Sequence, residues 1–331
     1  MSAETSTESH LSVAMATNQD EVTQTTGVTS SSSSGAALYF ECLVVVVGVI
    51  GTAANGLVLY ALVVSKQHIK HALIVNQNAL DLFTCLFLVI TYAVKLANIQ
   101  LIGSRGYWLC MFILSENLIL CVMCGSSVNL TLIAVERYLK VCHNVWSKRH
   151  VRKWMIYVAI VFSWISGFVS YMAVVFETSA VIDGVCYGLV IWKSPESRLA
   201  TVIYYLSSTY IIVLVTFVFC YVKILMAIRR QSRVMASYNG AGSSTAQTHQ
   251  LNQIQSNVVK TMILVCAFFA IAWLPEKIFV LLFGLGLNLN FLNNGYYVTM
   301  FFGFLYICTN VKITTTLECC QSNFYKGIPD T

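Results

Sequence analysis

Long apolar runs alternate with short polar segments along most of the chain. Seven of these runs are long enough to cross a bilayer, because about 20 apolar residues in a helix span a hydrocarbon layer of about 30 Å. The seven runs are Ala36–Ser65, Ala72–Asn98, Trp108–Leu139, Trp154–Phe176, Leu199–Ile228, Val258–Phe283 and Tyr296–Leu317. This pattern predicts an all-α membrane protein, a seven-transmembrane helix bundle that occupies residues 36–317.

The composition supports helices in lipid. Hydrophobic residues make up 57% of the 331 residues and charged residues only 10%, which excludes a chain built mainly of large soluble domains. The apolar runs also lack the alternation of apolar and polar positions that a lipid-facing β-barrel requires. The fold class is therefore helical.

Three polar segments lie outside the spans. Residues 1–35 are rich in Ser and Thr and carry acidic side chains but no Lys or Arg, so we expect a disordered extracellular tail without a cleavable signal. Residues 229–257 are rich in Ser, Gln, Asn and Gly and are expected to form a flexible inner loop. Residues 318–331 are expected to form a short cytoplasmic tail.

Basic residues indicate the orientation, because cytoplasmic loops retain more Lys and Arg than translocated ones. Most of the 20 Lys and Arg residues fall on one side if the N-terminus is outside and the C-terminus inside. The exceptions are Lys95, Arg105, Lys193, Arg198 and Lys277. We interpret the basic loops as this topology signal rather than a nucleic-acid site, and expect a multi-pass protein of the plasma membrane.

The 12 cysteines divide by their depth in the predicted bundle. Several lie inside spans and act there as small apolar residues. Cys110 and Cys186 fall on the oxidising outer side, but Cys42 lies near the same surface, so spacing leaves the disulfide pairing open. Cys319 and Cys320 suit reversible palmitoylation at the inner surface, although two unmodified thiols fit the sequence nearly as well.

Asp81 is a carboxylate in the middle of the second span, where a buried charge is costly and marks a functional candidate. Asn55, Ser126 and Asn310 fall at a similar depth. These groups fit a small polar site for a cation such as sodium. The alternative is a hydrogen-bonded network that joins the first, second, third and seventh helices, and we favour the cation slightly because an ionised carboxylate in lipid needs a counter-ion.

Two motifs mark the inner half and the sixth span. Glu136-Arg137-Tyr138 ends the third run at the cytoplasmic boundary, where an ordinary helix end also favours Arg. Trp273-Leu274-Pro275 predicts a kink in the sixth span, because Pro lacks an amide donor and crowds the preceding turn. Each motif alone is weak, and their order and spacing carry more information.

Taken together, the spans and motifs resemble a rhodopsin-like (class A) G-protein-coupled receptor from Ala36 to Cys320. The positions that match the family are Asn55, Asp81, Glu136-Arg137-Tyr138, Trp164, Tyr221, Phe269 and Trp273-Leu274-Pro275. The resemblance implies an extracellular ligand, a heterotrimeric G-protein partner and no enzymatic activity. It also implies that Cys110 and Cys186 form the family's outer disulfide.

The same resemblance assigns roles by position. Coupling to the G protein falls on Glu136, Arg137, Tyr138 and Tyr221, and the activation switch on Phe269, Trp273, Pro275 and Asn310. A sodium ion, the single cofactor expected, would lie at Asp81, Ser126 and Asn310. In such receptors the sixth helix swings outward about its Pro kink and opens an inner cavity for the G protein.

The chain departs from the family pattern at several positions. Ala272 precedes the switch tryptophan in place of Cys, Val213 stands where the fifth helix has Pro, and Ser127 replaces a branched apolar residue. Cys110 lies about two residues farther from Arg137 than is usual. The seventh-helix motif reads Asn310-Val311-Lys312-Ile313-Thr314, without its usual Pro and Tyr.

The ligand is constrained mainly by exclusion. Ile119 occupies the position where amine receptors place Asp, and Phe304 the position where opsins place their retinal-linking lysine. The candidate ligand residues are Tyr92, Glu116, Ile119, Glu276, Lys277 and Tyr297. With Glu41 and Lys95, they form a mixed-charge mouth that suits a peptide, a zwitterion or another small molecule, unless these charges pair with one another.

Other classes of membrane protein remain open. A transporter or channel would use the polar site at Asp81, but no internal repeat and no pair of broken helices supports it. A receptor relative that does not signal is compatible with the altered seventh-helix motif. An enzyme is not expected, because no span contains a His-x-x-x-His or Gly-x-Ser-x-Gly pattern.

Overall fold

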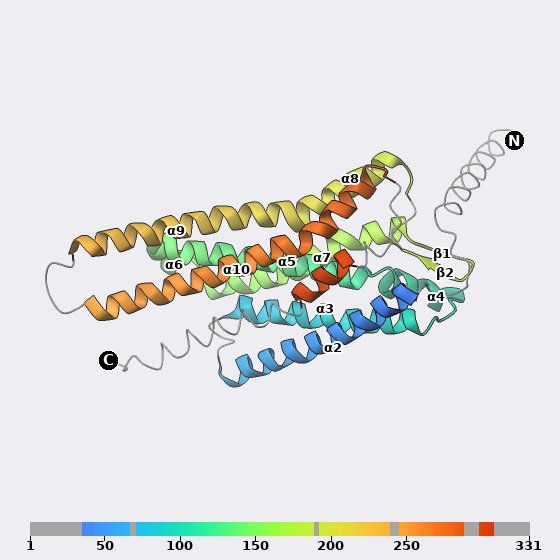
Figure 1. The fold of residues 1–331 in the computed structure, drawn as a ribbon, viewed down its shortest axis with the longest axis horizontal. Coiled ribbons are helices and arrows are strands. Elements are labelled where there is room, and N and C mark those ends of the chain that lie inside the picture. The colour runs from blue at the N-terminus through green and yellow to red at the C-terminus, as the bar shows by residue number, and fades with distance from the viewer. Residues whose placement is uncertain (1–34, 67–70, 189–191, 239–244, 288–297, 308–331) are drawn as a thin grey trace.

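The computed structural model describes residues 35–66, 71–188, 192–238, 245–287 and 298–307. Within these residues it is a bundle of long helices whose axes lie roughly along one direction, as the all-α prediction requires (Figure 1). Six helices are long and apolar enough to cross a membrane, and Val298–Ile307 is a shorter apolar helix at the seventh run. The rest of that run lies outside the described residues, and the orientation in the membrane stays a prediction.

The first four runs form antiparallel neighbours. They correspond to α2 (Gly35–Val64), α3 (Ala72–Leu96), the series α4 (Gly103–Leu109), η2 (Cys110–Leu114) and α5 (Asn117–Cys142), and α7 (Lys153–Thr178). The fifth and sixth runs correspond to α8 (Pro195–Leu206), η3 (Ser207–Ile211) and α9 (Ile212–Tyr238), and to α10 (Thr245–Gly284). Helix α5 is central, since it packs against α3, α7 and α9.

Glycines bring α5 and α7 into backbone contact. A Cβ atom at Gly125 would lie 2.8 Å from the Ser163 carbonyl oxygen, and one at Gly167 would collide with the carbonyl of Cys121. Small residues at such crossings allow helices in lipid to gain van der Waals contact, since lipid supplies no hydrophobic drive for their association. The close crossing fixes α5 relative to α7.

A short hairpin and a small helix mark opposite ends of the bundle (Figure 1). Strands β1 (Ala180–Ile182) and β2 (Val185–Tyr187) are antiparallel, and α6 (Asn144–His150) lies at the other end. The disulfide between Cys110 and Cys186 ties β2 to the start of η2. The predicted pairing is confirmed, and Cys42 is a free thiol.

The outer part of the third span is not one regular helix. Segment η2 is a π-helix, with the Ser115 amide donating to the Cys110 carbonyl at 3.0 Å, and Glu116 has a left-handed backbone with φ of 61°. A π-turn and a break accommodate additional residues locally. This explains how Cys110 lies farther from Arg137 in sequence while α5 continues unbroken to the Glu136-Arg137-Tyr138 motif.

A second π-helix lies in the fifth span. Segment η3 joins α8 to α9, and the Ile212 amide donates to the Ser207 carbonyl. It precedes Val213, so the helix bulges next to this position without the proline that the family places there. The bulge turns Tyr210 toward α10, where its hydroxyl donates to the Ala270 carbonyl at 2.8 Å.

The structure differs from the sequence prediction at the inner loop. We expected residues 229–257 to be flexible, but α9 continues to Tyr238 and α10 begins at Thr245. The reason lies in the composition of the two helical parts, which contain neither Gly nor Pro and include good helix formers such as Arg, Gln, Met and Ala. Residues 239–244, which hold both glycines of the segment, lie outside the described residues.

Candidate functional site

A cavity of about 150 Å³ opens among α5, α7, α8, α10 and the helix Val298–Ile307. We call it the outer cavity, because it lies near the start of α5, close to the disulfide-tied hairpin. Much of its wall is apolar or aromatic, including Ile119, Trp192, Phe283, Met300 and Phe304. Mostly apolar concave sites with a few polar groups are typical of small-molecule binding.

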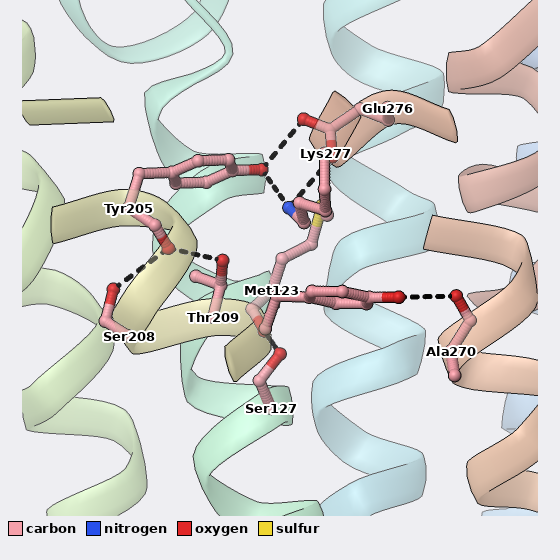
Figure 2. Close-up of polar contacts among 9 residues, drawn as sticks. Met123, Ser127, Tyr205, Ser208, Thr209, Ala270, Glu276 and Lys277 are labelled. Atoms are coloured by element: carbon pink, nitrogen blue, oxygen red, sulfur yellow. Dashed lines mark hydrogen bonds and ion pairs between the residues drawn. The ribbon is translucent and has the colours of Figure 1, made fainter. Parts of the chain in front are cut away.

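A polar cluster forms the side of the outer cavity where α8 meets α10. Figure 2 shows the Tyr205 hydroxyl between Glu276 and Lys277, donating to Glu276 Oε1 at 3.1 Å and accepting from Lys277 Nζ at 2.5 Å. Lys277 Nζ also lies 2.9 Å from Glu276 Oε2, with both side chains almost fully buried. We call these three residues the Tyr205 cluster.

The Tyr205 cluster lies directly after Pro275 of α10. Pro275 lies inside the continuous helix just before Glu276, and the two charged residues extend toward Tyr205 of α8. The Lys277 ammonium lies 4.0 Å from the centroid of the Tyr205 ring and 5.1 Å from that of Trp273. Aromatic faces attract cations, which helps to hold this ammonium at membrane depth.

A second ion pair lies at the α3 side of the outer cavity. Glu116 Oε1 accepts from Lys95 Nζ at 2.6 Å and from the Tyr92 hydroxyl at 3.0 Å. The break at the start of α5 presents this carboxylate, since Glu116 is the residue with the left-handed backbone. A strained non-glycine residue of this kind persists where surrounding contacts hold it, and such residues cluster at functional sites.

Below the outer cavity, aromatic rings connect α10 to its neighbours. Trp273 packs against Gly303, where a Cβ atom would meet its ring carbons at 2.6 to 2.9 Å. The Phe269 ring lies 5.6 Å from Tyr306, 5.9 Å from Tyr210 and 6.0 Å from Phe217, measured between centroids. The predicted switch residues Phe269 and Trp273 of α10 are therefore buried, both against Val298–Ile307 and Phe269 also against η3 and α9.

A smaller cavity of about 30 Å³, which we call the central cavity, extends from Trp273 and Lys277 toward Asp81. Asp81 Oδ1 accepts from Gln77 Nε2 at 2.9 Å and from Ser126 Oγ at 3.1 Å. Asp81 and Ser126, two of the predicted sodium ligands, are therefore in direct contact. Asn55 instead donates to the Gly51 carbonyl at 2.9 Å, and Asn310 lies outside the described residues.

The polar network extends from Asp81 into α7. Asn129 donates to Gln77 Oε1 at 2.9 Å, and Asn76 donates to Asn129 Oδ1 at 2.9 Å and to Ser163 Oγ at 3.2 Å. Trp164 Nε1 completes it by donating to Asn76 Oδ1 at 2.9 Å. The network thus joins the second, third and fourth spans in the described residues, and the predicted link to the seventh span through Asn310 stays a prediction.

The inner end of α5 carries three of the predicted coupling residues, and the fourth, Tyr221, lies on α9. Glu136 forms an ion pair with Lys140 at 2.6 Å, and Arg137 Nε is buried without a hydrogen-bond partner among the described residues. Tyr221 is buried within electrostatic range of Arg137. The Tyr138 hydroxyl lies 3.1 Å from His143 Nε2. The Arg137 guanidinium therefore has bonding capacity that its neighbouring carboxylate does not use.

The structure brings together most of the predicted ligand residues that it describes. Glu116, Ile119 and Glu276 line the outer cavity, Lys277 lines the central cavity, and Tyr92 reaches the site through Glu116. Tyr297, Asn310, Cys319 and Cys320 lie outside the described residues, so their predicted roles stay predictions.

Sequence reasoning missed Tyr205, which bridges the two charged residues of α10. Its signal was present but faint: Tyr205 and Thr209 are four residues apart in the fifth apolar run and so share one helix face. A polar stripe of this kind inside an apolar span indicates a face that is turned toward protein rather than lipid.

Comparison with known proteins identifies the family. The family model described as 7 transmembrane receptor (rhodopsin family) matches residues 54–310. Human Opsin-5 and mouse Opsin-5 are each 25% identical to the chain over 253 residues, covering 70% of this chain. The match covers 65% of the human protein and 61% of the mouse protein, less than two thirds of either. The chain belongs to the rhodopsin family of seven-transmembrane receptors and is a multi-pass membrane protein.

Proposed function

We propose that the chain is a plasma-membrane receptor that binds an extracellular ligand in the outer cavity and promotes nucleotide exchange on a heterotrimeric G protein. One observation carries this proposal. The outer cavity and the kink of α10 share the same residues, because Glu276 and Trp273 line the cavity and flank Pro275. A ligand that contacts this wall contacts the hinge of the sixth span.

Two side chains tie α10 to the fifth span on either side of the kink. Tyr205 bonds to Glu276 and Lys277 after Pro275, and Tyr210 bonds to the Ala270 carbonyl before it. Figure 2 shows both ties, with Glu276 and Lys277 at one and Ala270 at the other. A ligand that binds one arrangement of these ties better than another shifts the population of α10 conformers.

The inner end supplies groups suited to a protein partner. Arg137 is not held by Glu136, which pairs with Lys140, and Tyr221 lies close by. A guanidinium has several donors in a rigid fork and bonds readily to carbonyl and carboxylate groups. We propose that an outward movement of α10 exposes this pair to the G protein.

The ligand is proposed to be held without a Schiff base to the seventh span. The two relatives bear the name opsin, but Phe304 of this chain stands where opsins place the retinal-linking lysine. A phenyl ring has no amine to condense with an aldehyde, and Phe304 is fully buried at the cavity wall. The outer cavity therefore suits a small molecule that is bound non-covalently at this position.

A sodium ion at Asp81 remains a separate proposal. The carboxylate of Asp81 and the hydroxyl of Ser126 are oxygen ligands of the kind that a hard cation takes. They would hold the ion and couple it to the central cavity. The transporter or channel alternative has less support, because Asp81 already accepts hydrogen bonds from Gln77 and Ser126 within a packed network.

A cell-based screen tests the proposed function. Cells that express the receptor are exposed to small metabolites and short peptides while second messengers are recorded. We expect a response that Arg137→Ala abolishes. The matched control is Arg105→Ala, which removes an exposed arginine of α4 at the opposite end and should leave the response intact. Ion flux without any second-messenger response would favour the channel or transporter instead.

A further inference from the structure

We propose that the outer cavity selects an electrically neutral, mostly apolar small molecule, because the charged groups of Glu116, Glu276 and Lys277 beside it are each paired with a neighbouring side chain. This inference rests on the proposed function only in taking the outer cavity as the ligand site. It names the chemical class of the ligand and the residues that set charge selectivity, Glu276 and Lys277. A peptide or zwitterion, which the sequence also allowed, is disfavoured.

Glu276 and Lys277 form a buried ion pair. Their charged groups lie 2.9 Å apart, and their side chains are only 5% and 6% exposed. Tyr205 bonds to both, donating to the carboxylate and accepting from the ammonium. A buried pair of this kind is neutral as a unit, and separating it leaves an uncompensated charge in a low-dielectric interior.

The other carboxylate of the cavity wall, that of Glu116, is also paired with a lysine. Glu116 lines the outer cavity, and its Oε1 atom accepts from Lys95 and Tyr92. The wall thus contains two carboxylates, Glu116 and Glu276, each within ion-pair distance of a different lysine. A cationic ligand would therefore have to compete with a lysine for either acid.

The remaining surface of the outer cavity consists largely of apolar and aromatic side chains, among them Val202, Val280, Phe283 and Met300. A charged ligand would either keep its charge unpaired against this surface or displace a lysine or carboxylate from its partner. A neutral ligand does neither, and it gains free energy from burying apolar surface.

The Tyr205 cluster still offers polar recognition without net charge. The Tyr205 hydroxyl, the Glu276 carboxylate and the Lys277 ammonium provide donors and acceptors around one point at the junction of α8 and α10. A hydroxyl, carbonyl or ring N–H at one end of an apolar molecule would hydrogen-bond here. Such a group binds next to Trp273 and the α10 kink, which links charge selectivity to the proposed switch.

A matched set of probes tests the proposal on the full chain in lipid nanodiscs. Indole, tryptamine and indole-3-acetate share one ring system and differ in charge, as do 2-cyclohexylethanol, 2-cyclohexylethylamine and cyclohexylacetate. Thermal unfolding is followed against probe concentration, since a ligand that binds the folded state raises the unfolding temperature. We expect half-maximal stabilisation by a neutral member at a concentration at least about tenfold lower than by its charged counterparts.

Substitutions of the pair sharpen the test. Lys277→Met leaves the Glu276 carboxylate without its counter-ion and should shift preference toward the amine. Glu276→Gln leaves the Lys277 ammonium without its counter-ion and should shift preference toward the carboxylate. The double variant Glu276→Gln with Lys277→Met again has no net charge at this point and should restore the preference for the neutral probe. A cooperative unfolding transition of each single variant without a probe shows that it is folded well enough to interpret.

Location is checked with two tryptophan substitutions on α10. Val280→Trp fills the outer cavity and should abolish stabilisation, whereas Ile278→Trp lies on the exposed face and should preserve it. The proposal is overturned if charged probes stabilise the wild type best, if no neutral probe stabilises it, or if the single variants keep the neutral preference. Because the readout needs no G protein, failure here is distinct from failure to drive nucleotide exchange.

Discussion

The indole ring of Trp273 occupies the space that a side chain at position 303 would need. A Cβ atom at Gly303 would meet three ring carbons at 2.6, 2.8 and 2.9 Å. Trp273 is buried and lines both the outer and central cavities. The contact makes the position of the tryptophan dependent on a glycine in the seventh span.

Gly303→Ala should therefore displace Trp273 and disturb the proposed switch. We expect a loss of about 1–3 kcal/mol in the free energy of unfolding, as is typical of overpacking, together with a changed basal rate of nucleotide exchange. The measurements are thermal unfolding and GDP release in nanodiscs. Gly56→Ala is the control, because an added Cβ at Gly56 meets nothing within 4 Å. Equal behaviour of the two variants would show that the contact is not tight in the protein.

The crossing of α5 and α7 should be sensitive to the same kind of change. Gly167→Ala places a methyl group against the Cys121 carbonyl and should force the two helices apart. Loss of their close packing should lower the unfolding temperature and the yield of folded receptor more than Gly56→Ala does. A Gly167→Ala variant as stable as the wild type would argue against direct backbone contact at this crossing.

The polar network should contribute to stability through Asn76. Asn76→Leu leaves Asn129, Ser163 and Trp164 without the hydrogen bonds that the amide provides. Each buried group that loses its partner costs about 1–3 kcal/mol, so the unfolding temperature should fall clearly. Gln100→Leu, at an exposed position after α3, removes an amide without a comparable effect. If both variants unfold at the same temperature, the network is not stabilising.

The disulfide should fasten the hairpin at the outer end. Cys110→Ser and Cys186→Ser should each lower the free energy of unfolding, by about 2–5 kcal/mol if the bond acts as in small secreted domains. The double variant should be no worse than either single variant, because both remove one bond. Cys42→Ser, which changes a free thiol, is the control. Additive losses from the two single variants would mean that the cysteines act separately.

The positions of the helices followed from strong local patterns in the sequence, whereas the disulfide followed from the family resemblance. Apolar runs of spanning length cannot satisfy their backbone groups in lipid unless they are helical. Cys110 and Cys186 matched a family pairing and are joined. The inner ends of α9 and α10 were underestimated, since polar helices resemble loops when composition alone is considered.

The chemistry of the outer cavity was only partly predictable. Glu116, Glu276 and Lys277 stood out as charges in apolar runs, but their partners depend on how neighbouring helices rotate and bulge. The left-handed backbone of Glu116 and the π-helix that contains Tyr210 have no clear signature in the sequence. The role of Tyr205 depends on the packing of α8 against α10, which the sequence pattern does not reveal.

The most direct measurement of the central claim is GDP release from purified heterotrimeric G proteins by the receptor in nanodiscs. Tyr205→Phe removes the hydroxyl that joins Glu276 to Lys277 and should loosen the tie between α8 and α10. We expect the wild type to accelerate GDP release from at least one G protein, Tyr205→Phe to alter that rate, and Arg137→Ala to eliminate it. GDP release that none of these proteins changes, for any G protein and with any stabilising probe present, would contradict the account.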